Sequence, residues 1–182
     1  MVAVGLVASH RVAVERFRLN QLMLVREVSA QIANALSVNE LARLVTDLIQ
    51  QTFHYYYVAI FTVHEHAPIL RFRASALSPI KGRRRAKIAL EVDEGQGLIG
   101  QAATTGERIV VPDVQKDERY RFIDSLPETR SEAVIPLKFE GRVLGVLDVQ
   151  SNQVDAFHPN DLLVLEALAD TIGRVSKRWQ PN

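Results

Sequence analysis

The feature that most constrains the fold of this chain is a set of three closely spaced glycines, Gly95, Gly97 and Gly100. Their spacing is that of a dinucleotide-binding fingerprint, in which a glycine turn joins a buried parallel strand to a long helix. Here, however, residues 87–92 alternate polar and apolar like a half-exposed strand, and Gly106 limits the helix to about residues 98–105. Because so short a helix cannot carry the crossover between parallel strands, we interpret the glycines as a tight turn that brings a short helix close to a sheet.

A series of short motifs follows the glycines. In chain order the motifs are Pro112-Asp113-Val114, Asp117 with Arg119-Tyr120, Ser131 to Leu137, Gly141, Gly145 to Val149, and Phe157. Together with the glycine turn they resemble, over residues 38–178, the GAF domain family. The resemblance implies an α+β fold. A central antiparallel sheet of about six strands would carry the N- and C-terminal helices on one face, and short helices and loops over a small-molecule pocket on the other.

The hydrophobic pattern predicts most elements of such a fold. Ser37 and Glu40 form a capping box that starts a helix over residues 38–53, with apolar side chains at i, i+3, i+4 and i+7. Pro159 starts a closing helix that runs to about residue 178. We expect strands near residues 55–63, 69–75, 87–92, 109–111, 132–139 and 142–150, and short helices near 98–105 and 119–125.

The composition narrows the classes of function. Lys and Arg number 22 and Asp and Glu 21, so the net charge of +1 gives no reason to expect nucleic acid as a partner. The chain has no cysteine, which excludes disulfides, thiolate metal sites and cysteine nucleophiles and makes the cytoplasm the expected compartment. In the resembled family, bilin attachment and methionine sulfoxide reduction use cysteines. No carboxylate pair or Ser-His-Asp arrangement suggests other catalysis, so we expect no enzyme activity, no cofactor and no metal site.

Residues 11–36 contain no Gly or Pro and predict a long helix with more apolar surface than one core-facing stripe requires. One set is formed by Leu22, Ser29, Ile32 and Leu36, and a second by Phe17, Leu24, Val28 and Ala35. We expect the same helix of a second protomer to cover the excess and give a homodimer; the alternative is a helix enclosed within one subunit. The expected organisation is an N-terminal helical extension (1–36), a GAF-like domain (37–178) and a tail (179–182).

Two segments have more than one interpretation. Residues 1–9 are apolar but too short to span a bilayer, and they lack a basic leading region. They suit an ordinary helix start; the alternative is the remnant of a transmembrane helix, which would be the only membrane contact expected. Residues 81–87 are strongly basic and form either a solvated loop or a site for a phosphate or an acidic partner.

If a small ligand binds, we expect it beneath the short helix after Gly100 and beside residues 111–122. Small side chains there leave room, aromatic rings supply apolar walls, and Asp113 and Ser131 supply directed polar contacts, a mixture typical of ligand pockets. The candidate ligand-binding residues are Ile99, Ala102, Ala103, Val111, Asp113, Tyr120, Phe122, Ser131 and Ala133.

Two specific ligands are weighed against the sequence. Family members that bind cyclic nucleotides carry an Asn-Lys, then a Phe, then an Asp-Glu. Asn152, Phe157 and Asp161 match this pattern, but Gln153 and Leu162 stand in place of the Lys and the Glu. We therefore interpret the Phe as a core residue and the Asp as a first-turn acid of the closing helix. A haem would need an axial histidine, and nothing in the histidine spacing selects one.

The resemblance implies a regulatory or sensory module of a bacterial signal-transduction protein, such as a histidine kinase of a two-component system or a cyclic-dinucleotide enzyme. Its expected role is to bind a small ligand or to relay a conformational change through the helical dimer interface. The alternative is a ligand-free dimerisation scaffold. A haem-based sensor or an enzyme is the least favoured class, and the sequence names neither the ligand nor the output domain.

Overall fold

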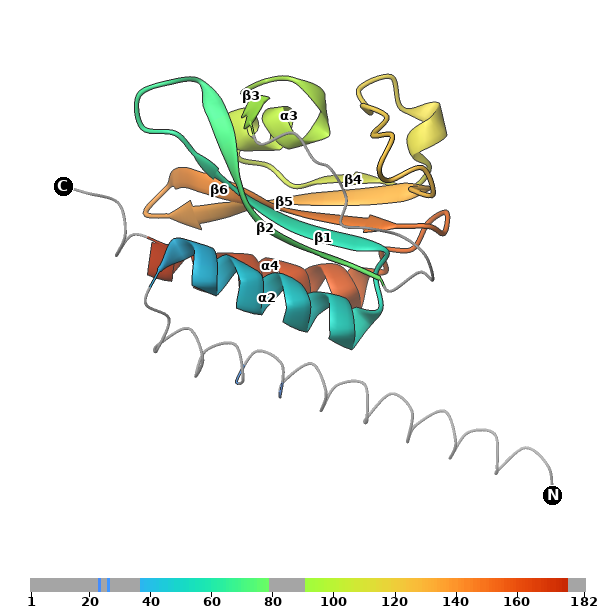
Figure 1. Ribbon diagram of the computed structural model, residues 1–182, viewed down its shortest axis with the longest axis horizontal. Coiled ribbons are helices and arrows are strands. Elements are labelled where there is room, and N and C mark those ends of the chain that lie inside the picture. The colour runs from blue at the N-terminus through green and yellow to red at the C-terminus, as the bar shows by residue number, and fades with distance from the viewer. Residues whose placement is uncertain (1–22, 24–25, 27–36, 79–90, 177–182) are drawn as a thin grey trace.

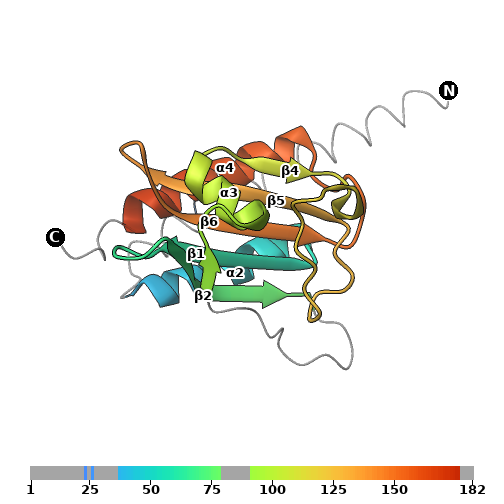
Figure 2. The ribbon, with the colours of Figure 1, turned by 90° about the horizontal axis from the view of Figure 1, so that it is seen from above.

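The apolar segment at residues 57–63 becomes a strand near the centre of a six-stranded antiparallel sheet (Figures 1 and 2). The computed structural model describes residues 23, 26, 37–78 and 91–176. Its strands are β1 (Tyr57–Val63), β2 (Ile69–Leu77), β3 (Glu91–Asp93), β4 (Ile109–Val111), β5 (Ser131–Phe139) and β6 (Arg142–Ser151). Their spatial order is β3-β2-β1-β6-β5-β4. The predicted α+β fold is confirmed.

Two long helices cover one face of the sheet (Figure 1). The helix α2 (Val38–Phe53) packs on β1 and β2, and α4 (Pro159–Ser176) packs on β5 and β6. The Ser37 hydroxyl accepts the N–H of Glu40 at 3.1 Å, which confirms the predicted helix start. The apolar stripes of both helices meet the sheet in one core, which includes Leu41, Val45, Ile49, Val58, Ile60, Ile135, Leu147, Leu165, Leu168 and Ile172.

The opposite face is covered by α3 (Gly97–Thr105), the 3-10 turn η1 (Val114–Lys116) and the irregular segment 117–130 (Figure 2). A second core lies between these elements and the sheet, and it includes Tyr57, Phe61, Leu98, Ala102, Val114, Leu126, Val134 and Val146. The helix predicted near 119–125 does not form. The Asp117 side chain accepts the N–H of Arg119 at 2.9 Å, and such local bonding competes with a helical turn.

The far end of β5 contains a proline and a break in register. Pro136 pairs with Val146 of β6, but β4 pairs only with residues 132–134, so the proline lies where β5 has lost its outer neighbour. The register shifts between Leu137 and Lys138, as a bulge requires.

The glycine turn has the geometry expected from its sequence. Gly95 and Gly97 have φ values of 81° and 63°, a left-handed region that L side chains rarely adopt. A Cβ on Gly100 would lie 2.4 Å from the carbonyl oxygen of Asp93. The glycines therefore serve a tight turn and a close approach of α3 to the end of β3. Because all described strand pairs are antiparallel, the dinucleotide-binding interpretation is excluded.

Replacing Gly100 by alanine should lower the free energy of unfolding by about 1–3 kcal/mol, because the added methyl overlaps backbone that cannot withdraw without moving β3 from α3. Gln101→Ala is the matched control in the same helix, and it should stay within about 0.5 kcal/mol of the parent. Urea unfolding at fixed pH measures both. Equal stability of the two variants would contradict the close approach.

Five expectations fall wholly or largely outside the described residues. These are the apolar segment 1–9, the dimerising helix over 11–36, the basic segment 81–87, all but the end of the strand near 87–92, and the tail 179–182. Within the part of the chain that the structure describes, no helix is both long and apolar enough to cross a membrane.

Candidate functional site

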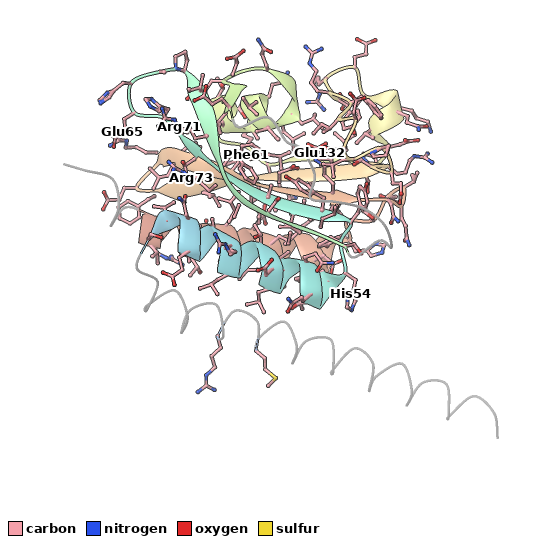
Figure 3. All side chains as sticks on the ribbon, in the orientation of Figure 1. His54, Phe61, Glu65, Arg71, Arg73 and Glu132 are labelled. Atoms are coloured by element: carbon pink, nitrogen blue, oxygen red, sulfur yellow. The ribbon has the colours of Figure 1, made fainter. Side chains whose placement is uncertain are left out.

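Two acidic side chains are buried between the sheet and the α3 side of the molecule. Glu132 of β5 is 3% exposed and Asp148 of β6 is 1% exposed. Side chains alternate along a strand, so Glu132 shares its face with Val134, and Asp148 shares its face with Val146; both valines belong to the α3-side core. Figure 3 labels Glu132 on this side of the sheet.

A short chain of hydrogen bonds holds Asp148. The Thr129 hydroxyl donates to Oε1 of Gln150 at 2.7 Å, and Nε2 of Gln150 donates to Oδ2 of Asp148 at 2.9 Å. The other carboxylate oxygen, Oδ1, has no hydrogen-bond donor among the described groups, and the buried hydroxyl of Tyr57 has no well-formed hydrogen bond. Unpaired buried polar atoms are rare in native structures, and a bound ligand, ion or water is one explanation for them.

Burial changes the acidity of both carboxyl groups. It raises the pKa of Glu132 well above its usual range, and the nearby Asp148 carboxylate raises it further. Burial also raises the pKa of Asp148 to about 7, although hydrogen bonds from Gln150 and from the Glu132 carboxyl oppose the shift. The two carboxyl groups lie close enough for hydrogen bonding to contribute to both shifts, and such coupling favours one proton shared by the pair.

The segment 117–130 and β1 surround the pair with neutral or internally paired groups. Tyr120 is half-buried beside Thr129, and burial raises the pKa of its hydroxyl. Burial, with the charge of Asp148 as the next cause, raises the pKa of Tyr57 as well. Asp117 is paired with Arg119 through two short contacts, 2.9 Å to Nε and 2.6 Å to Nη2. No described Lys, Arg or His forms an ion pair with Glu132 or Asp148.

Five of the candidate ligand-binding residues lie on the α3 side, in or against its core: Ile99, Ala102, Ala103, Val111 and Tyr120. Asp113 caps η1 through the N–H of Gln115 and lies 3.4 Å from Lys116 and 3.5 Å from Arg130. It is therefore engaged in holding its own turn. Phe122 is 64% exposed and forms no wall of the α3-side core.

The remaining two candidates lie on the other face of the sheet. Ala133 belongs to the core beneath α2 and α4, and the Ser131 hydroxyl donates to the carbonyl oxygen of Gln153. Alternate residues of a strand point to opposite faces, so Glu132, between these two candidates, faces the α3 side instead. Glu132 was the available signal, as the one acidic residue in an otherwise apolar stretch of the strand.

Two residues of the cyclic-nucleotide pattern lie where the structural interpretation expects them. Phe157 packs in the core beneath the long helices, with its ring centroid 5.3 Å from that of Tyr55. Asp161 lies in the first turn of α4. Both residues are thus on the face opposite the carboxyl pair. His54, which is labelled in Figure 3, is exposed at the end of α2. No cluster of three potential metal ligands occurs among the described residues.

Comparison with known proteins assigns the chain to a family. The GAF domain model matches residues 35–175, and the chain belongs to the GAF domain family. GAF domain-containing protein A of Dictyostelium discoideum is 29% identical over 125 residues, which cover 68% of this chain and 72% of that protein. The free methionine-R-sulfoxide reductase of Saccharomyces cerevisiae is 36% identical over 97 residues, 52% of this chain and only about half (53%) of the enzyme.

A solved structure gives the same picture of the fold. The free methionine-R-sulfoxide reductase of Neisseria meningitidis, in complex with its substrate, has a TM-score of 0.74 at 24% identity and covers 86% of this chain and 88% of its own. The expectation that this chain has no enzyme activity is therefore contradicted, because relatives in sequence and in fold are reductases. The GAF fold accommodates catalysis as well as regulation, and membership of the family excludes neither.

Proposed function

We propose that this GAF domain is a sensory module that binds a small ligand with a protonated amino group at Glu132 and Asp148. The observation that carries the proposal is the buried acidic pair with one carboxylate oxygen, Oδ1 of Asp148, left without a donor. A buried carboxylate without a cation or a full set of donors is costly. An ammonium group supplies both a positive charge and up to three donors.

The ligand would reach the pair through the segment 117–130. This segment has no regular secondary structure among its described residues, and Phe122 and its neighbours Arg119 and Arg121 are exposed. Segments with few regular backbone hydrogen bonds open at a lower free energy than a sheet does. The small side chains of Ala102 and Ala103 on α3 and the ring of Tyr120 would then form the apolar part of the site.

The relatives suggest the chemical class of the ligand. Free methionine-R-sulfoxide is an amino acid, and its ammonium group is what a pair of carboxyl groups would select. We therefore propose an amino acid or a close derivative as the ligand. In a sensory module of a signal-transduction protein, the sheet would pass the binding event to α2 and α4, because Glu132 and Asp148 belong to strands that pack on α4.

Isothermal titration with methionine-R-sulfoxide, with the common amino acids and with the counterparts that lack the amino group tests the proposal. At least one amino acid should bind, and its counterpart without the amino group should bind at least about 30-fold more weakly, the equivalent of about 2 kcal/mol. Equal affinity for both members of the pair, or no binding by the whole panel, would contradict it.

We also propose that the N-terminal extension forms a homodimer. Leu24→Glu combined with Val28→Glu should yield a monomer whose thermal unfolding is otherwise unchanged, because two carboxylates would interrupt the second apolar stripe. Light scattering measures the mass. Ser29→Glu, one residue beyond Val28 and in the other stripe, is the comparison variant. A monomeric parent, or a dimer that survives both substitutions, would contradict the proposal.

A further inference from the structure

The hydrogen bonds around Asp148 give the two carboxyl groups different roles. Gln150 has both ends of its amide committed, with Oε1 accepting from Thr129 and Nε2 donating to Oδ2 of Asp148. Among the described residues, no comparable amide bond fixes Glu132, whose neighbour across the ladder is Gln150 itself. A donated hydrogen bond favours the ionised form of the carboxyl that receives it. Asp148 is thus the anion of the pair, and Glu132 is the proton carrier.

In the absence of ligand, a proton on Glu132 is the nearest substitute for the missing donor to Asp148. Oδ1 of Asp148 lacks a donor while the Glu132 carboxyl lies within hydrogen-bonding reach. When Glu132 is protonated, its O–H can donate to Asp148, and the two buried groups then carry one negative charge in place of two. Repulsion between two unpaired, buried carboxylates makes the doubly ionised empty site unfavourable.

We propose that Thr129 and Gln150 are positioning residues that present Asp148 as the acceptor of a ligand's ammonium group, and that the ammonium expels the single proton held by Glu132. This inference rests on the function proposed above. The ammonium nitrogen donates to Asp148 and to the newly ionised Glu132, and the proton passes to the buffer. The positive charge of the ligand replaces the proton, so binding and proton release are linked.

The groups that face the pair do not supply an alternative proton. From β1, Tyr57 presents a hydroxyl whose pKa burial raises above its ordinary value. From the covering segment, Tyr120 is shifted in the same direction, and Asp117 is neutralised by Arg119. The helix α3 has no titratable side chain. Glu132 is therefore the one described group near Asp148 that can release a proton on binding at neutral pH.

Calorimetric titration of the full chain with methionine-R-sulfoxide, in buffers of different ionisation enthalpy, counts the protons released. Release should approach one proton at pH values below the raised pKa of Glu132, and over that range affinity should rise up to tenfold per pH unit. Glu132→Gln keeps the shape but cannot release this proton, so its proton release should fall well below one and its affinity should rise less steeply with pH, the remainder being due to Asp148. Equal heats for the parent in all buffers would overturn the inference and leave amine binding intact.

The pH dependence of ligand affinity tests the positioning role of Thr129 and Gln150. Thr129→Val should release the Gln150 amide, weaken its bond to the Asp148 carboxylate and strengthen proton binding by the pair, so the rise in affinity should move to higher pH. If Thr129 had only a structural role, its loss would lower affinity equally at every pH. That result would overturn the positioning role. Thr171→Val on α4 is the control, because its hydroxyl bonds only to the carbonyl of Ala167 on the other face of the sheet.

The proton shared by Glu132 and Asp148 can also be detected in the protein without ligand. Carbon NMR of the Glu132 and Asp148 carboxyl groups in the free protein should show Glu132 losing its proton at a pH well above the range in which an exposed glutamate ionises. A Glu132 signal that titrates at the ordinary glutamate pKa would overturn the shared proton. If no amine binds the parent, the proposed function fails together with the release step, and the free-protein titration still decides whether the pair holds a proton.

Discussion

Asp148→Asn should weaken binding of the amino-acid ligand at least about 30-fold, which corresponds to about 2 kcal/mol, the lower end of the cost of removing one partner from a buried charged pair. The substitution preserves the size of the side chain and its bond to Gln150, since an amide oxygen can accept from Nε2. It removes the negative charge that the ammonium group would meet. Calorimetry or a competition assay at pH 7 measures the affinity.

The matched control for this substitution is Asp161→Asn. Asp161 lies in the first turn of α4, on the opposite face of the sheet, and its loss should leave affinity within about twofold. The unfolding free energies of both variants show whether each remains folded. Unchanged affinity in a folded Asp148→Asn protein would contradict the assignment of the site, and equal losses in both variants would point to a general effect on the domain.

The free energy of unfolding should fall as pH rises from about 4.5 to about 7. Burial raises the pKa of Glu132 and Asp148 in the folded protein, so the folded state binds protons that the unfolded chain, with ordinary carboxyl pKa values near 4, has released. Unfolding therefore releases protons, and higher pH favours it. The expected slope is about 1.4 kcal/mol per pH unit for each proton released, or roughly 3 kcal/mol across the range.

The other carboxyl groups with shifted pKa values affect the free energy of unfolding outside this pH range, or only weakly within it. Hydrogen bonds and cations lower the pKa of Asp113 and Asp117, so any stability they contribute is lost only as pH falls through those lowered values. The partly buried Asp161 has a raised pKa and adds a small slope of the same sign. The double substitution Glu132→Gln with Asp148→Asn should remove most of the slope. Urea unfolding at half-unit pH steps measures it, and identical slopes for parent and variant would contradict the buried pair.

Local signals in the sequence were sufficient for most of the fold. The Ser37 cap and the stripe that follows it define α2 because a helix start needs a side-chain acceptor and a buried face needs a 3.6-residue period. The glycine turn was interpreted correctly because Gly106 stops the helix too early for a parallel crossover. The segment 117–130 was not, since its conformation depends on the side-chain bond between Asp117 and the backbone of Arg119.

The site was harder to predict than the fold, for a physical reason. Whether Ser131 or Glu132 faces α3 depends on which face of β5 meets the long helices. A shift of one residue in the register of the strand would exchange the two. The chain Thr129–Gln150–Asp148 joins residues about twenty positions apart through side-chain geometry that no local pattern encodes. Burial of an acidic side chain is likewise a property of the packed layers, because the same residue on an outer strand face would simply be solvated.

Hydrogen exchange with and without the amino-acid ligand tests the central claim, the location of the binding site, most directly. Protection should increase most in residues 98–125, which include α3 and the covering segment, and less in β6, which is already stable. The Asp148→Asn variant should show no such change at the same ligand concentration. Protection confined to residues 79–90, or to α2 and α4, would show that the ligand binds another surface and that the acidic pair is not the site.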